Sequence, residues 1–303
     1  MFRCACLTVV MGLIVGATRA DETYTIKPRK SGKGDSAQVA VQENAKKNDK
    51  LLSLDGTLIK EESKKTSKTL KYKETILEQP KGQDRPTKLQ RAYEKAEIKE
   101  DDTTRKLPYD GKTVLIEKKG NKYHFQIVGG MELEGDEAND FDQEFNQGRA
   151  DGHDFQMVLL PSKPVAVGAS WKIDARKVVK ELNKGHKGET LVVDFAKAVA
   201  TGKLVSAFKK DGKQFGVIQY HLELPITELG TTDNRFQLDA GAKMVLNLRE
   251  EGCIDGSVDD VVSKVILGFN YSMVLKKDGT AKFKAMRVLD GSRHGSRTPV
   301  PKK

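Results

Sequence analysis

Residues 218–224 read Ile-Gln-Tyr-His-Leu-Glu-Leu, and this heptapeptide decides the fold class. Its apolar residues are Ile218, Tyr220, Leu222 and Leu224, and a polar residue separates each one from the next. Successive side chains of a β-strand point to opposite faces. A period of two therefore predicts a strand with one buried face and one face in solvent.

The same alternation recurs along much of the chain, in residues 70–76, 123–127, 244–248 and 269–275. Asp-Gly, a dipeptide suited to tight hairpins, occurs seven times, with the glycines at Gly56, Gly111, Gly152, Gly212, Gly256, Gly279 and Gly291. Residues 277–279 and 118–122 each join two alternating runs and predict hairpins. We therefore predict a mainly β protein with a curved antiparallel sheet or half-barrel.

Helix is expected in only one or two short segments. Residues 136–147 begin with acidic groups and place Phe141 and Phe145 four apart, as one face of a helix requires. Residues 175–183 place Val178, Val179 and Leu182 on one face. Residues 89–98 fit a helix and a strand equally well, so both remain open there.

The organisation of the chain follows from these patterns and from shifts in composition. Residues 1–20 predict a signal peptide, because a short basic start precedes an apolar run of about 13 residues that ends in small residues. Such a run is too short to cross a bilayer, so we expect an exported protein, periplasmic or extracellular, without a transmembrane segment after cleavage. An uncleaved anchor is the alternative.

Four regions are expected after the signal. Residues 21–50 read as a polar arm that enters a first strand near Ala37, Val39 and Val41, and 51–160 as an antiparallel β region that contains the helix at 136–147. Residues 161–290 read as a second β region, or as part of the same continuous sheet. Residues 291–303 lack an apolar face and predict a disordered basic tail. The connector 160–171 (LPSKPVAVGASW) separates the two β regions, and we expect its Trp171 to be a buried anchor.

Residues with obvious chemistry are few and scattered. The five histidines are never within five positions of one another, and phosphate-loop, dinucleotide-binding and Gly-x-Ser-x-Gly motifs are missing. The densest acidic stretch, 132–144, is interpreted as a solvated helix start rather than a metal site, with Asp140 and Glu144 on one face. Cys253 is interpreted as a small buried residue. We therefore assign no catalytic, cofactor-binding or metal residue and predict a protein that is not an enzyme and needs no cofactor.

Charge narrows the range of partners. The chain carries a net charge of +10, and removal of residues 1–20 leaves +8. Aromatic residues make up only 6% of the chain, which argues against a nucleic-acid partner. An anionic envelope component remains compatible with this charge.

Two segments carry a resemblance to a known family: the connector with its Leu-Pro, Pro-Val, Gly and Trp, and residues 107–125 (LPYDGKTVLIEKKGNKYHF). Over residues 60–290 the chain resembles a family of uncharacterised exported bacterial proteins of the planctomycete type. The resemblance implies a fold similar to the curved half-barrels of periplasmic lipoprotein carriers. It implies no activity and no functional residue.

Three functions remain in competition. The first is a non-enzymatic binding protein of the cell envelope, for an apolar ligand or a protein partner. The second is a structural or adhesion module that contacts anionic envelope polymers. The third is a hydrolase whose catalytic residues are dispersed along the sequence.

Overall fold

The computed structural model describes residues 22–27, 32–81, 85–146, 152–184, 189–231, 234–277 and 280–301. The predicted signal peptide, 1–20, lies outside the described residues. Within them the chain is mainly β, which confirms the predicted fold class. None of the described helices has both the length and the apolar character that a membrane crossing needs.

The elements follow one another in chain order as β1 (Thr23–Tyr24), β2 (Ser36–Ser53), β3 (Leu58–Glu78), β4 (Lys88–Glu100), β5 (Thr103–Lys106), β6 (Thr113–Lys119), β7 (Lys122–Ile127), the 3-10 turn η1 (Gly135–Glu137), α1 (Asn139–Phe145), α2 (Gly152–Leu159), β8 (Val165–Ala166), β9 (Ser170–Lys172), α3 (Ala175–Lys184), β10 (Glu189–Val193), β11 (Val199–Lys210), β12 (Lys213–Thr231), β13 (Asn234–Gln237), β14 (Lys243–Cys253), β15 (Val261–Lys277) and β16 (Thr280–Pro299).

The described strands form one 14-stranded antiparallel sheet and a small pair, β1 with β8. The order across the large sheet is β7-β6-β4-β3-β2-β16-β15-β14-β12-β11-β9, with β5 on β4 and β10 and β13 on β12. The last strand, β16, lies between β15 and β2. Strands from both predicted β regions therefore hydrogen-bond within a single sheet.

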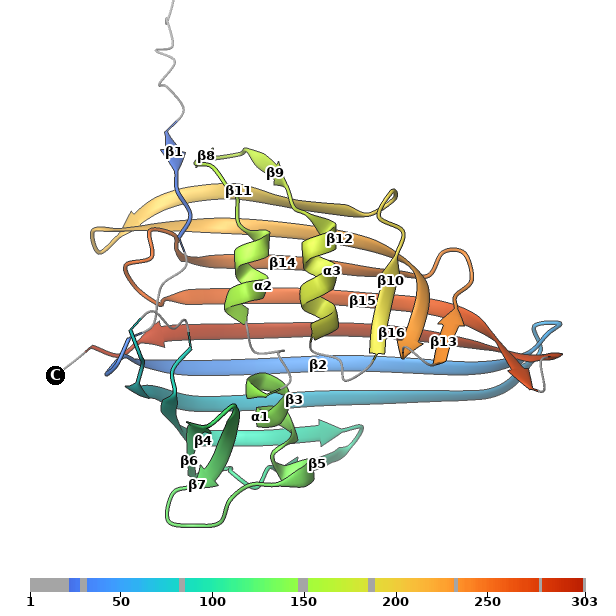
Figure 1. Ribbon diagram of the computed structural model, residues 1–303, viewed down its shortest axis with the longest axis horizontal. Helices are drawn as coiled ribbons and strands as arrows, with labels where there is room; N and C mark the ends of the chain where they lie inside the picture. Colours follow the sequence, from blue (N-terminus) through green and yellow to red (C-terminus); the bar gives the residue numbers. More distant parts are fainter. Residues whose placement is uncertain are drawn as a thin grey trace, which may run out of the picture.

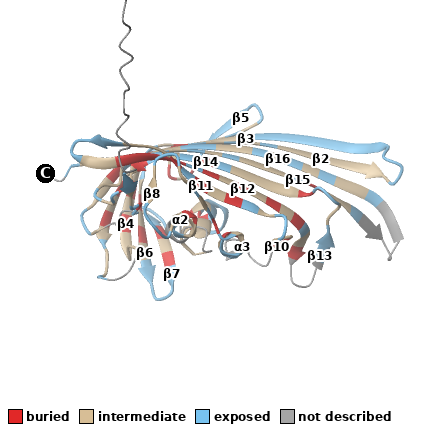
Figure 2. Cartoon of the chain, turned by 90° about the horizontal axis from the view of Figure 1, so that it is seen from above, coloured by how far each residue is buried: buried red, intermediate tan, exposed pale blue. Residues whose placement is uncertain are grey.

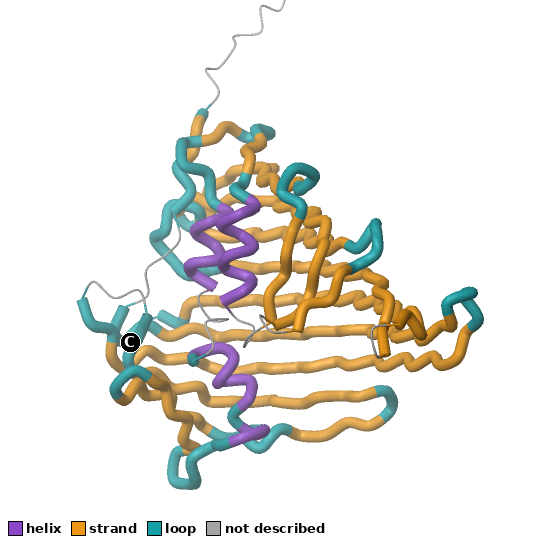
Figure 3. The backbone as a smooth tube through the Cα atoms, turned by 45° about the vertical axis from the view of Figure 1, so that its right-hand side comes forward, coloured by secondary structure: helices purple, strands orange, loops and turns teal. Residues whose placement is uncertain are grey.

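The sheet is arched, and the helices lie inside the arch (Figures 1 and 2). Figure 3 shows all three helices against the same side of the sheet. We call this side the inner face and the opposite side the outer face. Residues directly opposite on neighbouring strands share a face. Tyr220, Leu248 and Val265 are paired in this way and belong to a core beneath the helices, so they mark the inner face.

Three apolar cores line the inner face. One joins β2, β3, β4, β6 and β7 to α1 and centres on Tyr93, Tyr109 and Phe141, whose rings contact one another. The other two lie under α2 and α3, against β11, β12 and β14. The cores therefore occupy the two flanks of the arch.

The prediction of a disordered tail at 291–303 is wrong for residues 291–299. These residues form half of β16 and pair with β15 on one side and β2 on the other. Backbone hydrogen bonds to two neighbours hold a strand that has no apolar stripe of its own. Gly291 and Gly295 leave room on the inner face, and Asp290-Gly291 is accordingly not a turn but part of the strand.

Other expectations have mixed outcomes. The strand expected at the end of the polar arm 21–50 is confirmed as the first part of β2, but β2 begins at Ser36, so the arm is shorter than predicted. Residues 89–98, left open, lie in β4. The hairpin at 118–122 is confirmed, and β15 and β16 pair as expected on either side of 278–279, residues outside the described part.

The two predicted helical segments are confirmed as η1 with α1 and as α3. A third helix, α2, was not predicted, because Asp151-Gly152 reads as a turn. Trp171 is half-buried rather than buried, although it does pack against the core under α2.

Candidate functional site: an open hollow on the inner face

The long strands β2, β3, β15 and β16 extend beyond the helices, toward the right of Figure 1. In Figure 2 the space beneath this end of the arch holds no helix. Phe283, directly opposite Ser53 on this face, is correspondingly exposed there, at 39%. The sheet therefore presents an uncovered stretch of its inner face.

A hollow of about 240 Å³ lies in this stretch. Apolar parts of Leu51, Tyr271, Met273 and Ala285 line it. The register places Met273, Ala285 and Leu51 directly opposite one another on β15, β16 and β2, with Tyr271 two positions along β15. The floor of the hollow is therefore a continuous apolar surface on three neighbouring strands.

Charged pairs border this floor. Arg287 donates from Nε and a terminal nitrogen to the two carboxylate oxygens of Asp49, at 2.6 and 2.9 Å. Lys47 Nζ also lies 2.7 Å from Asp49, and Lys60 Nζ lies 2.5 Å from Glu62. One carboxylate thus serves two cations, so the border carries an excess of positive charge.

The ion pair fixes the protonation state of the border. The hydrogen bonds from Arg287 lower the pKa of Asp49 to about 2, against the smaller opposing effect of burial. Asp49 is therefore ionised throughout the physiological range. The hollow therefore combines fixed charges with an apolar floor, a combination suited to binding an amphipathic molecule.

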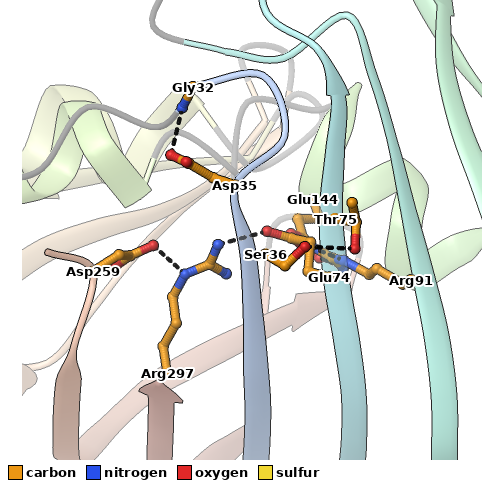
Figure 4. Close-up of polar contacts among 9 residues, drawn as sticks. All are labelled: Gly32, Asp35, Ser36, Glu74, Thr75, Arg91, Glu144, Asp259 and Arg297. Carbon is orange, nitrogen blue, oxygen red and sulfur yellow. Dashed lines mark hydrogen bonds and ion pairs between the residues drawn. The ribbon is translucent and has the colours of Figure 1, made fainter. Parts of the chain in front are cut away.

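A second polar cluster, drawn in Figure 4, lies toward the other end of β3 and β16, at Glu74 and Arg297. Glu74 accepts hydrogen bonds from Arg91 Nε and from a terminal nitrogen of Arg297, both at 2.8 Å. Arg91 also pairs with both oxygens of Glu144 on α1, and Arg297 pairs with Asp259. This network joins α1, β3, β4 and β16.

Burial in this network is nearly complete at its centre. Glu74 and Arg91 are only 8% and 6% exposed. Burial alone would raise the pKa of Glu74, but the two guanidinium groups of Arg91 and Arg297 outweigh it and hold that pKa below its ordinary value. Every charge at the centre has a partner, so we interpret the cluster as a structural clamp between strands.

The acidic stretch 132–144 supplies part of this clamp. Asp140 and Glu144 remain 40% and 42% exposed, as a solvated helix start requires, but both also have partners. Glu144 pairs with Arg91, and Asp140 accepts from the Tyr109 hydroxyl at 3.0 Å and pairs with Lys68. The two carboxylates do share a face, as the helical period predicts. Among the described residues, no three His, Cys, Asp or Glu side chains are grouped as a metal site requires.

The other singled-out residues lie apart from both clusters. His124 contacts Glu132 and His221 contacts Asn247 through Nδ1, at 2.7 and 2.8 Å, on the solvent side of their strands. Cys253 is free and half-buried, which corrects the expected burial, and its thiol donates to Asp255 at 3.0 Å. The side chains of His153 and His186 lie outside the described residues.

The charged residues that border the hollow could not be predicted from the sequence. The alternation at 269–275 places Tyr271 and Met273 on one face, which is the only local signal of the floor. Asp49 and Arg287 are 238 residues apart, and nothing near either residue indicates the other.

Comparisons with known proteins assign no family to the chain. No family model matches it, and no curated protein matches it. Among solved structures, one described as lipid-protein interactions in lipovitellin matches distantly, with a TM-score of 0.30 and 7% identity over 89% of this chain and 26% of that chain. The chain thus spans about a quarter of the lipovitellin chain.

A second solved structure, the in-vitro folded trimer of the outer membrane protein OmpT from Vibrio cholerae, matches with a TM-score of 0.20 and 10% identity. That match covers 87% of this chain and 99% of the other. Both scores are too low to indicate a shared fold.

Proposed function

We propose that this is an exported, non-enzymatic binding protein that carries an amphipathic ligand on the uncovered end of its inner face. The observation that supports it is the apolar floor of Leu51, Tyr271, Met273 and Ala285, open beside charged groups. Ligand sites commonly combine apolar lining with a few oriented polar groups. The ligand class that fits is an acyl chain with an acidic head group.

The size of the hollow supports a partly enclosed chain. Its volume of about 240 Å³ lies below the roughly 300–1,000 Å³ of ordinary ligand pockets. A linear chain that lies along the strands needs no closed cavity, because it can continue over the exposed Phe283. The positive excess beside Asp49 favours an acidic head group over a neutral one.

Binding of cis-parinaric acid, a fluorescent fatty acid, tests the proposal on the mature chain. Met273→Asp places a carboxylate in the apolar floor and should weaken binding about tenfold or more. The loss of one buried methylene contact already weakens binding by about 1 kcal/mol, and the carboxylate costs more to desolvate. Val274→Asp is the matched control, because Val274 is the next residue of β15 and points to the outer face.

The control should bind the fatty acid as the unaltered protein does. Equal binding by both variants would contradict the inner-face site. A chain that fails to bind the probe at all would contradict the ligand class.

A further inference from the structure

A row of basic and polar side chains crosses the outer face, on the opposite side of the sheet from the hollow. Lys203, Gln219, Arg249, Lys264 and His294 lie directly opposite one another on β11, β12, β14, β15 and β16. All five residues are exposed. With strands about 4.8 Å apart, the row extends over roughly 19 Å.

This row places like charges next to each other. Arg249 is directly opposite Lys264, so two like charges adjoin, and the imidazole of His294 is directly opposite Lys264 on the next strand. Like charges in such positions destabilise a sheet. The structure gives none of these three side chains an ion pair within the described part of the chain.

The inner face treats its cations differently. Lys47, Lys60, Lys68, Arg287 and Arg293 each pair with a carboxylate there. Some cations of the outer face are paired as well, Lys243 with Glu223 and Lys95 with Glu97, but no described carboxylate pairs with Arg249, Lys264 or His294. This unpaired row is the arrangement that an external anion requires.

The row itself continues through Gln42, Thr69 and Glu97 on β2, β3 and β4, and a hollow of about 460 Å³ lies beside it on the same three strands. Lys46, Lys65 and Lys99 line it together with Asp290 and Asp101. Lys46 and Lys65 are again directly opposite each other. From β11 to β4, the row and the hollow together cross eight neighbouring strands, roughly 34 Å.

Hydroxyl and amide groups flank the cations. Ser67, Asn44, Ser292 and Asn247 lie in the adjacent outer-face row. These groups match the hydroxyls of a sugar chain, and the cationic row contains none of the aromatic rings on which nucleic-acid bases stack.

We propose that the outer face binds an extended anionic polysaccharide, which lies across the strands from Lys203 to the hollow at Lys65. Its acidic groups neutralise Arg249 and Lys264, and its hydroxyls contact the flanking row. This site is separate from the ligand hollow of the inner face.

The test uses a heparin-derived octasaccharide and calorimetry on residues 21–303. The double variant Arg249→Gln/Lys264→Gln should bind it about five- to tenfold more weakly, since two exposed charge contacts contribute about 1 kcal/mol or slightly more together. The control Lys177→Gln/Lys180→Gln removes the same charge from α3 and should change the affinity less than twofold. Higher salt should weaken binding by the unaltered protein.

The double variant should also remain folded, and its urea midpoint should be unchanged or higher, because the opposed like charges are gone. Its affinity for cis-parinaric acid should not change. Equal octasaccharide affinity in the double variant and the unaltered protein would overturn the proposal. So would neutral dextran bound as well as the octasaccharide, or tighter binding to anionic vesicles or single-stranded DNA at the same salt.

Discussion

At the scale of single residues, Gly202 shows how closely the connector packs on the sheet. A Cβ at this position would lie 2.3 Å from Cε2 of Trp171. The indole is held there, since its Nε1 donates to the carbonyl oxygen of Leu159 at 2.8 Å and its ring meets Tyr220 edge to face. The half-buried tryptophan therefore anchors the connector through a contact that only glycine permits.

We predict that Gly202→Ala lowers the free energy of unfolding by about 1–3 kcal/mol, the usual cost of overpacking. In a Trp171→Ala background the same change should cost much less, because the ring that the methyl group meets is absent. Urea titration of the two single variants and the double variant measures this coupling. Additive effects would show that the two residues do not interact.

Glu250 makes the stability depend on pH. It lies on the inner face of β14, directly opposite Ile218, and burial raises its pKa to about 7. The ordinary pKa of glutamate is about 4.3. At pH values between about 4.3 and 7, Glu250 is therefore protonated in the folded chain and ionised in the unfolded chain. The free energy of unfolding should therefore fall as pH rises from about 4.5 to 7, by about 3 kcal/mol at most.

Glu250→Gln should remove this contribution, since glutamine does not titrate. We expect the variant to be more stable than the unaltered protein at pH 8 and to show a smaller decline between pH 4.5 and 7. Urea midpoints measured across this range give the comparison. Parallel profiles for the two proteins would place the pH dependence elsewhere.

At the scale of elements, the second half of β16 is the strand that the sequence pattern does not predict. The alternating runs predicted the faces of β7, β12, β14 and β15, because a half-buried strand carries its own period of two. Residues 291–299 carry no such period, because small and charged residues lie on both sides of a strand held by two neighbours. Its assignment depends on β2 and β15, which a local pattern does not contain.

The candidate site could not be predicted from the sequence for the same reason. Its floor is composed of residues from β2, β15 and β16, and only the β15 segment shows a local apolar alternation that the sequence reveals. Ala285 and Leu51 reach it through pairing between chain segments more than two hundred residues apart.

We predict that a chain ending at Asp290 does not reach the native fold, although the missing residues read as a tail. It leaves β2 and β15 with unpaired edges in the middle of the sheet and removes Arg297 from Glu74. A chain ending at Val300 keeps the whole strand and is the control. Circular dichroism and urea titration should show a native transition in the control only; a native transition in both would contradict the role of β16.

At the scale of the whole molecule, the two flanks of the arch meet along a single ladder. All members of the first core come from residues 37–145, whereas those of the other two come from 24–26 and 155–269. Between the flanks run the pairing of β2 with β16 and the ion pair of Arg297 with Glu74. The structure therefore holds two apolar units together by backbone hydrogen bonds and a buried charge network.

This arrangement predicts that two co-expressed fragments, 21–149 and 150–303, associate and co-elute in size-exclusion chromatography, because each retains most of its core and the pairings of β2 with β16 and of β1 with β8 join them. Arg297→Glu should prevent co-elution, since it places a third carboxylate beside Glu74 and Asp259, and a broken buried pair costs about 3–5 kcal/mol. Arg293→Glu is the matched control on the same face of β16, where the ion pair with Glu43 is exposed and contributes about 1 kcal/mol or less. Separate elution of the unaltered fragments would show that the ladder cannot form without a continuous chain. Equal elution behaviour of the two variants would show that Arg297 is not needed to join the flanks.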